Sequence, residues 1–449
     1  MTSRSNHAGA SEPSATVSPG THIGGTLEVP GDKSISHRVA IFSALAEGTS
    51  SVIGFLQSED CVNTLRALEK LGASTTFDED GDLQITGCGG RLMEPTKALD
   101  FGNSGTGLRL MAGLVAGQGF PVELIGDESL TKRPMDRICQ PLAVMGAKID
   151  FLGQQGRPPF VISGSSLSAI DYSLPVASAQ VKSCLLLATL FAEGTTIIHE
   201  PRPTRDHTER LMRVLDVPIE VDGLTVALEG CGSEGPVVEA TEWYVPGDFS
   251  SAAFWIVSAA AREGGRATIQ NVGLNPRRTA FLNVLRRMGA KITVEVISED
   301  DVVEPYGDIQ VTGNALKGTE ISGDEIPNLI DEIPLVAVLG ALAEGETIIR
   351  DAEELRVKES DRIACMAENL RSLGICVEEF ADGMRVIGPA KLEPTGPVRS
   401  FGDHRIAMAM AILATYCSKP LKINNIACTE TSYPGFWGDL RHLGARVTF

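Results

Sequence analysis

The sequence lacks the cysteine patterns that disulfide frameworks and zinc sites require. Its nine cysteines are an odd number, and none of them forms a CxxC pair or a Cys/His set at metal-ligand spacing. We therefore expect reduced thiols, a cytoplasmic location and no bound metal.

Long apolar runs and an excess of basic charge are also missing. The longest apolar stretches, 252–261, 333–343 and 406–416, are shorter than the roughly 20 residues of a membrane-spanning helix, so we interpret them as buried helices. Lys and Arg number 39 against 58 Asp and Glu, a net charge of −19, which argues against nucleic acid or an anionic membrane as partner. An anionic ligand would therefore need a local basic pocket. Residues 1–21 are rich in Ser, Ala and Pro without an apolar segment, and we expect a disordered tail.

What the sequence does contain is a repeat. The phrase Ala-Glu-Gly-Thr closes an apolar helix at 46–49 and 192–195, and a variant follows at 343–347. About 25 residues after each copy, an amphipathic helix ends on a phrase like Leu-x-x-x-Gly-Ala, whose glycine suits a left-handed helix cap. With looser copies included, six units read strand, buried helix, strand, exposed helix, strand, strand. A solenoid scaffold is the alternative, and it is disfavoured because the units differ most at the starts of the buried helices.

Two Pro-Gly-Asp turns stand half a chain apart, in Val29-Pro30-Gly31-Asp32 and Val245-Pro246-Gly247-Asp248. With 449 residues, two domains of about 200 residues each are expected. We predict that the turns are crossovers between two α/β domains of three units each. One domain would span 32–245, and the other would combine 22–31 with 246–449.

The buried helices begin with polar and charged residues. Helix N-termini attract anions, and six of them facing one cleft, together with lysines and arginines, would bind a polyanion. These starts are Lys33-Ser34 with Arg38, Asn103 to Gly107 with Arg109, Ser178-Ala179-Gln180 with Lys182, Asp248 with Ser250-Ser251, Asp331-Glu332, and Asp403-His404-Arg405.

Three of the candidate motifs also have a plainer interpretation. The glycine-rich turn at 102–107 fits neither G-x-G-x-x-G nor a Walker loop. Asp331 precedes Pro334 and could be a helix cap. The stretch 358–362 could be only an acid-rich helix start.

Five motifs follow one another in a characteristic order. They are Lys33 to Arg38, Asp100 to Thr106, Leu130 to Met135, Arg356 to Arg362, and Gly402 to Arg405. Together they resemble the 5-enolpyruvylshikimate-3-phosphate (EPSP) synthase family, the 3-phosphoshikimate 1-carboxyvinyltransferases, from about residue 22 to the end. The resemblance implies an inside-out α/β barrel fold of βαβαββ units, no cofactor and no metal, a cytoplasmic enzyme of aromatic amino-acid biosynthesis, and a monomer.

The resemblance also implies the site. Asp331 and Glu359 would do the acid–base work, with Lys33 sharing proton transfer or balancing phosphate charge. Forked arginine donors suit phosphate and carboxylate. Shikimate 3-phosphate would be held by Lys33, Ser34, Arg38, Ser178, Ala179, Gln180, Arg205, Asp331 and Lys358. Phosphoenolpyruvate would be held by Lys33, Gly105, Arg133, Gln180, Arg362 and Arg405.

The chain departs from the family pattern at two places. Many members carry a lysine where this chain reads Thr431-Ser432-Tyr433-Pro434, so one cation on phosphoenolpyruvate is missing or supplied elsewhere. Members commonly have a proline where this chain has Leu110, and this departure together with the stretch 205–209, Arg-Asp-His-Thr-Glu, resembles a divergent bacterial branch. Because tolerant enzymes of that branch carry alanine at the place of Gly105, we predict sensitivity to glyphosate.

Two other proteins could share these features. UDP-N-acetylglucosamine 1-carboxyvinyltransferase has the same fold, but typically has a reactive cysteine in the loop that here spans 126–135 without one. A non-catalytic repeat scaffold would leave the gathered acids and bases unexplained. We further expect the cleft cations to repel one another, so that the free enzyme is open and substrate closes it.

Overall fold

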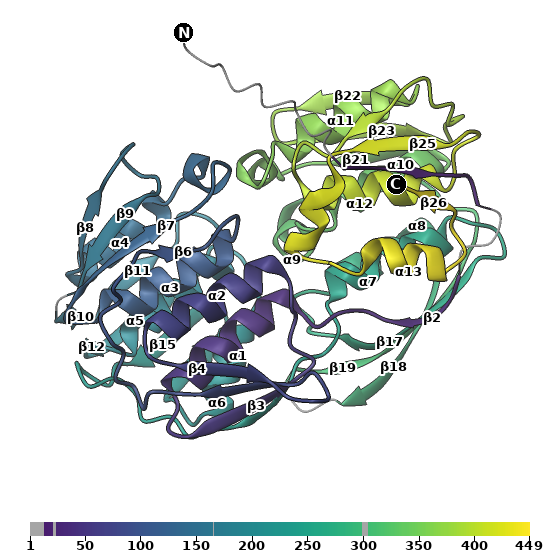
Figure 1. Cartoon of the computed structure of the whole chain (residues 1–449). Coiled ribbons are helices and arrows are strands. Elements are labelled where there is room, and N and C mark those ends of the chain that lie inside the picture. The colour runs from purple at the N-terminus through teal and green to yellow at the C-terminus, as the bar shows by residue number, and fades with distance from the viewer. Residues whose placement is uncertain (1–12, 21–23, 165, 299–303) are drawn as a thin grey trace, which may run out of the picture.

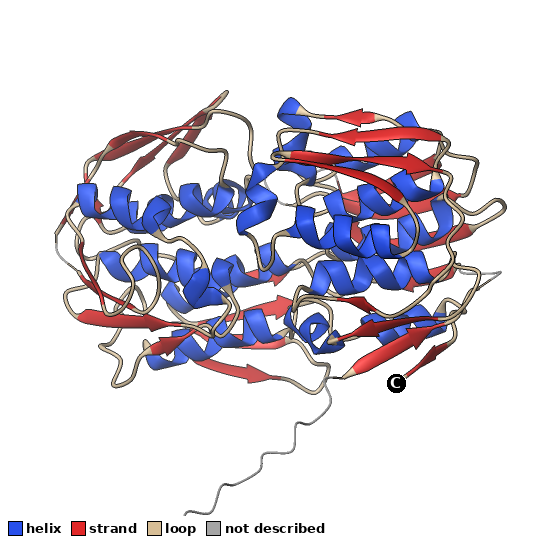
Figure 2. Ribbon diagram, turned by 90° about the horizontal axis from the view of Figure 1, so that it is seen from above, coloured by secondary structure: helices blue, strands red, loops and turns tan. Residues whose placement is uncertain are grey.

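The computed structural model describes residues 13–20, 24–164, 166–298 and 304–449. The chain forms two halves that lie side by side, one containing α1 to α6 and the other α7 to α13 (Figure 1). Helices fill the interior and strands lie on the outside, as the view from above shows (Figure 2).

Six helices of the described chain are buried on nearly every side, because small and apolar residues surround the whole helix. In the first half α3 packs against α1 and α5, and in the second α10 packs against α7 and α12. These helices are α1 (Lys33–Leu45), α3 (Gly105–Ala116), α5 (Ala179–Thr189), α7 (Phe249–Ala260), α10 (Ile333–Leu342) and α12 (His404–Ala414).

Amphipathic helices alternate with the buried ones along the chain, and the predicted left-handed glycine caps are confirmed. Gly146 after the second of these helices has φ 113° and Gly289 after the fourth has φ 105°. In the degenerate copy an aspartate, Asp216, takes the left-handed conformation instead, with φ 54°. The helices are α2 (Glu59–Lys70), α4 (Asp136–Met145), α6 (His207–Val214), α8 (Ala280–Met288), α11 (Arg362–Ser372) and α13 (Phe436–His442), with a short α9 (Ile326–Leu329) before α10.

Each repeat unit contributes a four-stranded sheet. The sheet orders in the first half are β16-β3-β5-β4, β6-β7-β9-β8 and β11-β13-β15-β14, and those in the second half are β18-β19-β17-β2, β20-β21-β23-β22 and β24-β25-β1-β26. The predicted α/β class with six repeat units is confirmed. The strands are β1 (Ser14–Val17), β2 (Gly25–Glu28), β3 (Thr49–Ile53), β4 (Ser74–Phe77), β5 (Leu83–Thr86), β6 (Leu99–Asp100), β7 (Pro121–Ile125), β8 (Lys148–Phe151), β9 (Phe160–Ser163), β10 (Leu167–Ser168), β11 (Asp171–Ser173), β12 (Ala192–Glu193), β13 (Thr195–His199), β14 (Ile219–Asp222), β15 (Thr225–Glu229), β16 (Glu242–Tyr244), β17 (Arg266–Gly273), β18 (Lys291–Ser298), β19 (Tyr306–Thr312), β20 (Glu320–Ile321), β21 (Gly345–Ile349), β22 (Cys376–Phe380), β23 (Gly383–Gly388), β24 (Val398–Arg399), β25 (Leu421–Asn424) and β26 (Val447–Thr448).

The two Pro-Gly-Asp turns lie against each other. The backbone N–H of Asp32 donates to Pro246 O and that of Asp248 donates to Pro30 O, both at 2.8 Å. Strand β2 pairs with β17 of the second half, and β16 pairs with β3 of the first. One buried apolar cluster draws on residues between 35 and 245, and the other on 15–29 and 249–447. The domain limits predicted from the sequence stay a prediction.

The expected disordered tail over 1–21 is wrong where the structure describes it. Residues 14–17 form β1, which pairs antiparallel with both β25 and β26. Ala15 and Val17 are buried there, and this short alternation in a Ser/Ala/Pro-rich stretch fills the middle of the sixth sheet. Residues 1–12 lie outside the described residues.

The described helices include none that is long and apolar enough to cross a membrane. Within the same residues no group of three or more His, Cys, Asp or Glu is arranged to hold a metal ion, and the nine cysteines are free.

Candidate active site

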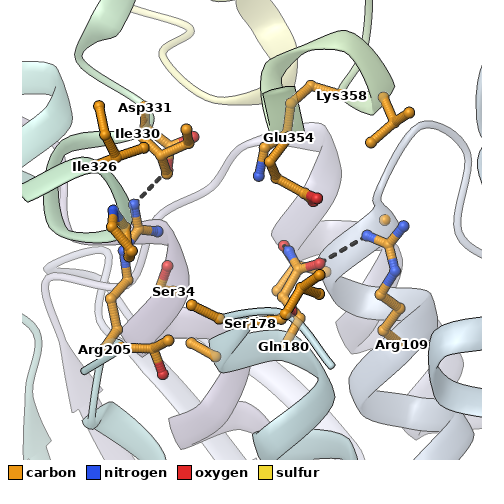
Figure 3. A pocket seen from close by; sticks show the side chains of 18 of the residues that line it. Ser34, Arg109, Ser178, Gln180, Arg205, Ile326, Ile330, Asp331, Glu354 and Lys358 are labelled. Carbon is orange, nitrogen blue, oxygen red and sulfur yellow. Dashed lines mark hydrogen bonds and ion pairs between the residues drawn. The ribbon is translucent and has the colours of Figure 1, made fainter. Parts of the chain in front are cut away.

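A cavity of about 380 Å³ lies where the two halves meet, and the buried helices begin around it (Figure 3). Both halves contribute to its wall. All fourteen site residues predicted from the sequence line it: Lys33, Ser34, Arg38, Gly105, Arg133, Ser178, Ala179, Gln180, Arg205, Asp331, Lys358, Glu359, Arg362 and Arg405.

Side-chain caps fix the helix starts at this cavity. Asp32 accepts from the N–H of Ile35 at 3.0 Å, and Ser104 accepts from that of Gly107 at 3.0 Å. Ser178 caps α5 in the same way, at 3.4 Å from Val181 N. Asp331 is not such a cap, because α10 is preceded by Glu332 without a side-chain cap bond. The carboxyl of Asp331 instead faces the cavity's cations.

Arg38 joins three helices of the first half. Its guanidinium donates to Thr208 Oγ1, Ser183 Oγ and the backbone oxygen of Ser34, each at 2.7 Å. Burial lowers the pKa of Arg38 to about 10. Arg38 therefore fixes the backbone at Ser34 while its remaining N–H groups are available to a ligand.

Lysine and arginine at the cavity face carboxylates. Lys33 Nζ lies 2.8 Å from Asp60 Oδ2, and Arg362 lies 2.6 Å from Glu359 and 3.3 Å from Asp331. Of the five cations expected to repel one another, four have an opposite charge beside them, since Arg133 also lies 3.5 Å from Glu359 and Arg405 lies 3.7 Å from Asp331. The expectation that the free enzyme is open and that substrate closes it stays a prediction. Asp60, at the start of α2, was not singled out in the sequence.

Three ion pairs also connect the two halves across the cavity. Arg205 lies 2.5 Å from Asp331 (dashed in Figure 3). Arg137 makes a forked contact with Glu354 at 2.7 and 3.3 Å. The third pair, at 3.5 Å, joins Arg133 and Glu359.

The two candidate acid–base carboxyls are held ionised. Burial acts to raise the pKa of Asp331, but Arg405 and Arg205 outweigh it and hold the pKa well below the usual range. Glu359 is partly buried, and this likewise acts to raise its pKa, but Arg362 and Arg133 hold the pKa well below normal. Both groups are therefore ionised in this arrangement and have no proton to give. Lys33 is the opposite case: burial acts to lower its pKa, but Asp60 and Glu359 raise it overall.

Gln180 is oriented from both ends of its amide. Its Oε1 accepts from Arg109 Nη1 at 2.7 Å (dashed in Figure 3). Its Nε2 donates to Thr106 Oγ1 at 2.8 Å. A Cβ at Gly105 would meet Arg109 Nη1 at 3.0 Å and Arg133 Nη1 at 3.1 Å. The glycine therefore lets these two guanidinium groups approach the helix start.

The position of the missing lysine has no cation. Thr431 Oγ1 hydrogen-bonds to His404 Nδ1 at 3.3 Å. Burial, together with Lys33 and Arg405, keeps the pKa of His404 well below normal, so the ring is neutral. Lys182 also differs from expectation, because it lies in a buried pair with Glu200 at 2.9 Å and does not line the cavity.

Sequence reasoning missed Asp60, Arg278 and Glu354 as lining residues. The charged pair Glu353-Glu354 just before a predicted site motif was a usable signal for the last. The other two lie far in the chain from the groups they contact, and no local pattern marks them.

Known proteins similar to this chain share its length and its fold. The chain matches the family EPSP synthase (3-phosphoshikimate 1-carboxyvinyltransferase) over residues 17–440. It is 51% identical over 424 residues to a 3-phosphoshikimate 1-carboxyvinyltransferase of Akkermansia muciniphila, covering 93% of this chain and 96% of that protein. The Bacillus subtilis enzyme of the same name is 45% identical, with coverage of 94% and 97%.

Solved structures agree in fold. EPSP synthase from Acinetobacter baumannii superposes with a TM-score of 0.84 at 42% identity, covering 97% of this chain and all of that one. The enolpyruvyl transferase NikO from Streptomyces tendae has a TM-score of 0.79 at 19% identity, covering 98% and 99%, which is a likeness of fold alone.

Proposed function

Because this chain belongs to the EPSP synthase family, we propose that the cavity between its halves is where its reaction takes place and that the fourteen predicted residues serve it. The enzyme transfers the enolpyruvyl group of phosphoenolpyruvate to the 5-hydroxyl of shikimate 3-phosphate and releases phosphate, in chorismate and aromatic amino-acid biosynthesis. The resemblance inferred from the sequence motifs is confirmed.

In this proposal shikimate 3-phosphate lies against the starts of α1 and α5. Its phosphate meets the N-terminal region of α5 at Ser178, where unpaired N–H groups and the helix dipole favour an anion. Arg205 and Lys358 reach the cyclohexene ring of shikimate 3-phosphate from opposite halves. Asp331 lies between them, 2.5 Å from Arg205.

Phosphoenolpyruvate occupies the end of the cavity near Gly105. Arg133, Arg362 and Arg405 offer forked donors to its phosphate and carboxylate. Its anionic groups compete with Glu359 for Arg133 and Arg362, so the pKa of Glu359 rises when phosphoenolpyruvate binds. Glu359 then carries the proton that the methylene carbon needs.

The acid–base cycle follows from these positions. Asp331, held ionised, takes the proton of the 5-hydroxyl as its oxygen attacks C2 of phosphoenolpyruvate. Glu359 gives its proton to the methylene carbon, which forms the tetrahedral intermediate. It then takes a proton back from the same carbon, now a methyl group, as the bond between C2 and the phosphate oxygen breaks. The proton held by Asp331 leaves with the phosphate. Lys33, held protonated by Asp60 and Glu359, balances the phosphate charge.

The observation that carries this assignment is the pair of half-buried carboxyls, Asp331 and Glu359, both contacted by Arg362 at 3.3 and 2.6 Å. Asp331→Asn and Glu359→Gln are each expected to lower kcat at least about a hundredfold in a phosphate-release assay with both substrates. Glu79→Gln, on an exposed turn, is the matched control and keeps wild-type kcat. Wild-type turnover by either carboxyl variant would refute its role.

We also propose that the enzyme acts as a cytoplasmic monomer built from the domains 32–245 and 22–31 plus 246–449. The two separate buried clusters support the division. Light scattering at several protein concentrations tests the monomer: a constant mass near 47.7 kDa is expected, and a mass of twice that value contradicts it.

A further inference from the structure

Arg278 is a buried arginine between the two crossovers, on the loop before α8, and only 3% of it is exposed. Its Nη2 lies 2.8 Å from Asp248 Oδ1 and 3.4 Å from Asp32 Oδ2. Asp32 caps α1 in the first half, and Asp248 caps α7 in the second. One guanidinium nitrogen is therefore shared by the capping carboxylates of both Pro-Gly-Asp turns.

The same side chain reaches toward the reaction site by two routes. Directly, its Nη1 lies 4.0 Å from Asp331 Oδ2. Indirectly, Nη2 contacts Ser250 Oγ at 3.0 Å, Ser250 donates to Glu332, and Glu332 Oε1 lies 4.0 Å from Arg405 Nη1. Displacing Arg278 would therefore change the contacts both at the crossovers and at Asp331.

The charges make this contact necessary. Asp32 and Asp248 are both nearly fully buried, and two like charges this close cannot both remain without a cation. Burial and the charge of Asp32 raise the pKa of Asp248 to about 6, even with Arg278 present. Other charged or titratable groups surround the pair. They are His37 and Arg38 of α1, Cys61 of α2, His207 at the start of α6, Glu332 and Asp331 before α10, Arg405 of α12, and Tyr433 before α13.

We propose that Arg278 is a positioning residue for the transferase reaction: by holding Asp32 and Asp248 together it sets the start of α1, with Lys33 and Ser34, against Asp331 of the other half. The inference rests on the proposed roles of Lys33 and Asp331. A purely structural role, in which Arg278 only fills space in the core, is the alternative.

Arg278→Met removes the charge and nearly keeps the volume, and Asp248→Asn removes one of the two carboxylates. The test measures kcat and both KM values of wild type, each single variant and the double variant from about pH 6 to about pH 9. Arg278→Met is expected to lower kcat about tenfold or more near pH 8, because small misplacements of reacting groups are costly. The loss of kcat should grow with pH. Without the arginine, Asp32 and Asp248 avoid two unpaired negative charges only by sharing a proton, and they hold that proton only at the acid end of the pH range.

In the double variant the surplus buried charge is gone, so kcat should recover at least about fivefold from that of Arg278→Met while staying below wild type. A loss that is independent of pH and unchanged by Asp248→Asn would overturn the proposal and indicate a structural role. If Arg278→Met does not fold, the double variant decides, and a wild-type kcat there overturns the proposal. Full activity of Asp331→Asn would refute the assigned base, but the coupling of Arg278 with Asp248 is measured on the overall reaction and would stand.

Discussion

Lys182 is expected to stabilise the first half without contacting substrate. One substitution can separate this stabilising role from a role in substrate binding. Its Nζ is completely buried between Glu200 at 2.9 Å and Glu209 at 2.5 Å, and both carboxylates are 2% exposed. Lys182→Met removes the charge and shortens the unbranched side chain by one heavy atom. Two carboxylates then remain buried without a cation.

Breaking a buried pair by removing one partner costs about 3–5 kcal/mol, because the other charge is left uncompensated. The matched control is Lys132→Met, whose pair with Glu128 at 2.7 Å is 66% and 88% exposed. For such an exposed pair no measurable change in the unfolding free energy is expected, because water screens both charges. The contrast between the two lysines therefore amounts to several kcal/mol.

The assay is urea unfolding followed by circular dichroism. A loss of about 3–5 kcal/mol corresponds to a fall in Tm of about 6–20 °C for a unit of some 200 residues. Adding Glu200→Gln and Glu209→Gln should restore part of the stability, since the orphaned charges are then gone. An unfolding free energy of Lys182→Met within about 1 kcal/mol of wild type would refute the reasoning, and a large rise in KM in the folded variant would place Lys182 in the site.

Three further predictions concern the cavity. Binding of inorganic phosphate to the shikimate 3-phosphate complex should take up protons, because the anion draws Arg133 and Arg362 away from Glu359 and raises the pKa of Glu359. Calorimetry in two buffers of different ionisation enthalpy measures the proton uptake, and Glu359→Gln should abolish it. Equal heats of the wild type in the two buffers would contradict the prediction. Gly105→Ala should raise the KM for phosphoenolpyruvate a few-fold and the half-inhibitory concentration of glyphosate about tenfold or more, because the added Cβ meets Arg109 and Arg133 at 3.0 and 3.1 Å. A wild type that is already insensitive to millimolar glyphosate would contradict this prediction. Arg137→Met should raise the KM for phosphoenolpyruvate up to about fivefold, because a partly exposed ion pair contributes at most about 1 kcal/mol. The control is Arg350→Met, since Arg350 pairs with Asp382 at 3.4 Å. Equal effects of the two substitutions would refute a role of Arg137 across the cavity.

Most of the fold could be predicted because its signals are local and repeated. The glycine caps and the apolar helices recur in each unit, so every copy supports the others. Strand β1 was missed because four residues with two buried side chains give too weak an alternation. Its pairing with β25 and β26, more than 400 residues away, is decided by the tertiary fold alone.

The candidate site likewise has parts that could be predicted from the sequence and parts that could not. The helix starts could be predicted because a capping residue and the polar residues after it are neighbours in sequence. The ion pairs could not: Lys33 meets Asp60 and Arg205 meets Asp331 only after the chain has folded. The expected repulsion counted the basic residues without the carboxylates that face four of them, and the open free enzyme that it implied stays a prediction.

The central claim is that shikimate 3-phosphate binds between the two halves, where Arg205 of the first half meets Asp331 of the second. Isothermal titration with shikimate 3-phosphate tests it most directly, with UDP-N-acetylglucosamine as the competing ligand and Arg205→Met as the variant. We predict a one-to-one complex of the wild type with shikimate 3-phosphate, a loss of about tenfold or more in affinity for Arg205→Met, as for a hydrogen-bonded charge pair, and no heat with the nucleotide sugar. The absence of binding by the wild type, or undiminished affinity in Arg205→Met, would contradict the account.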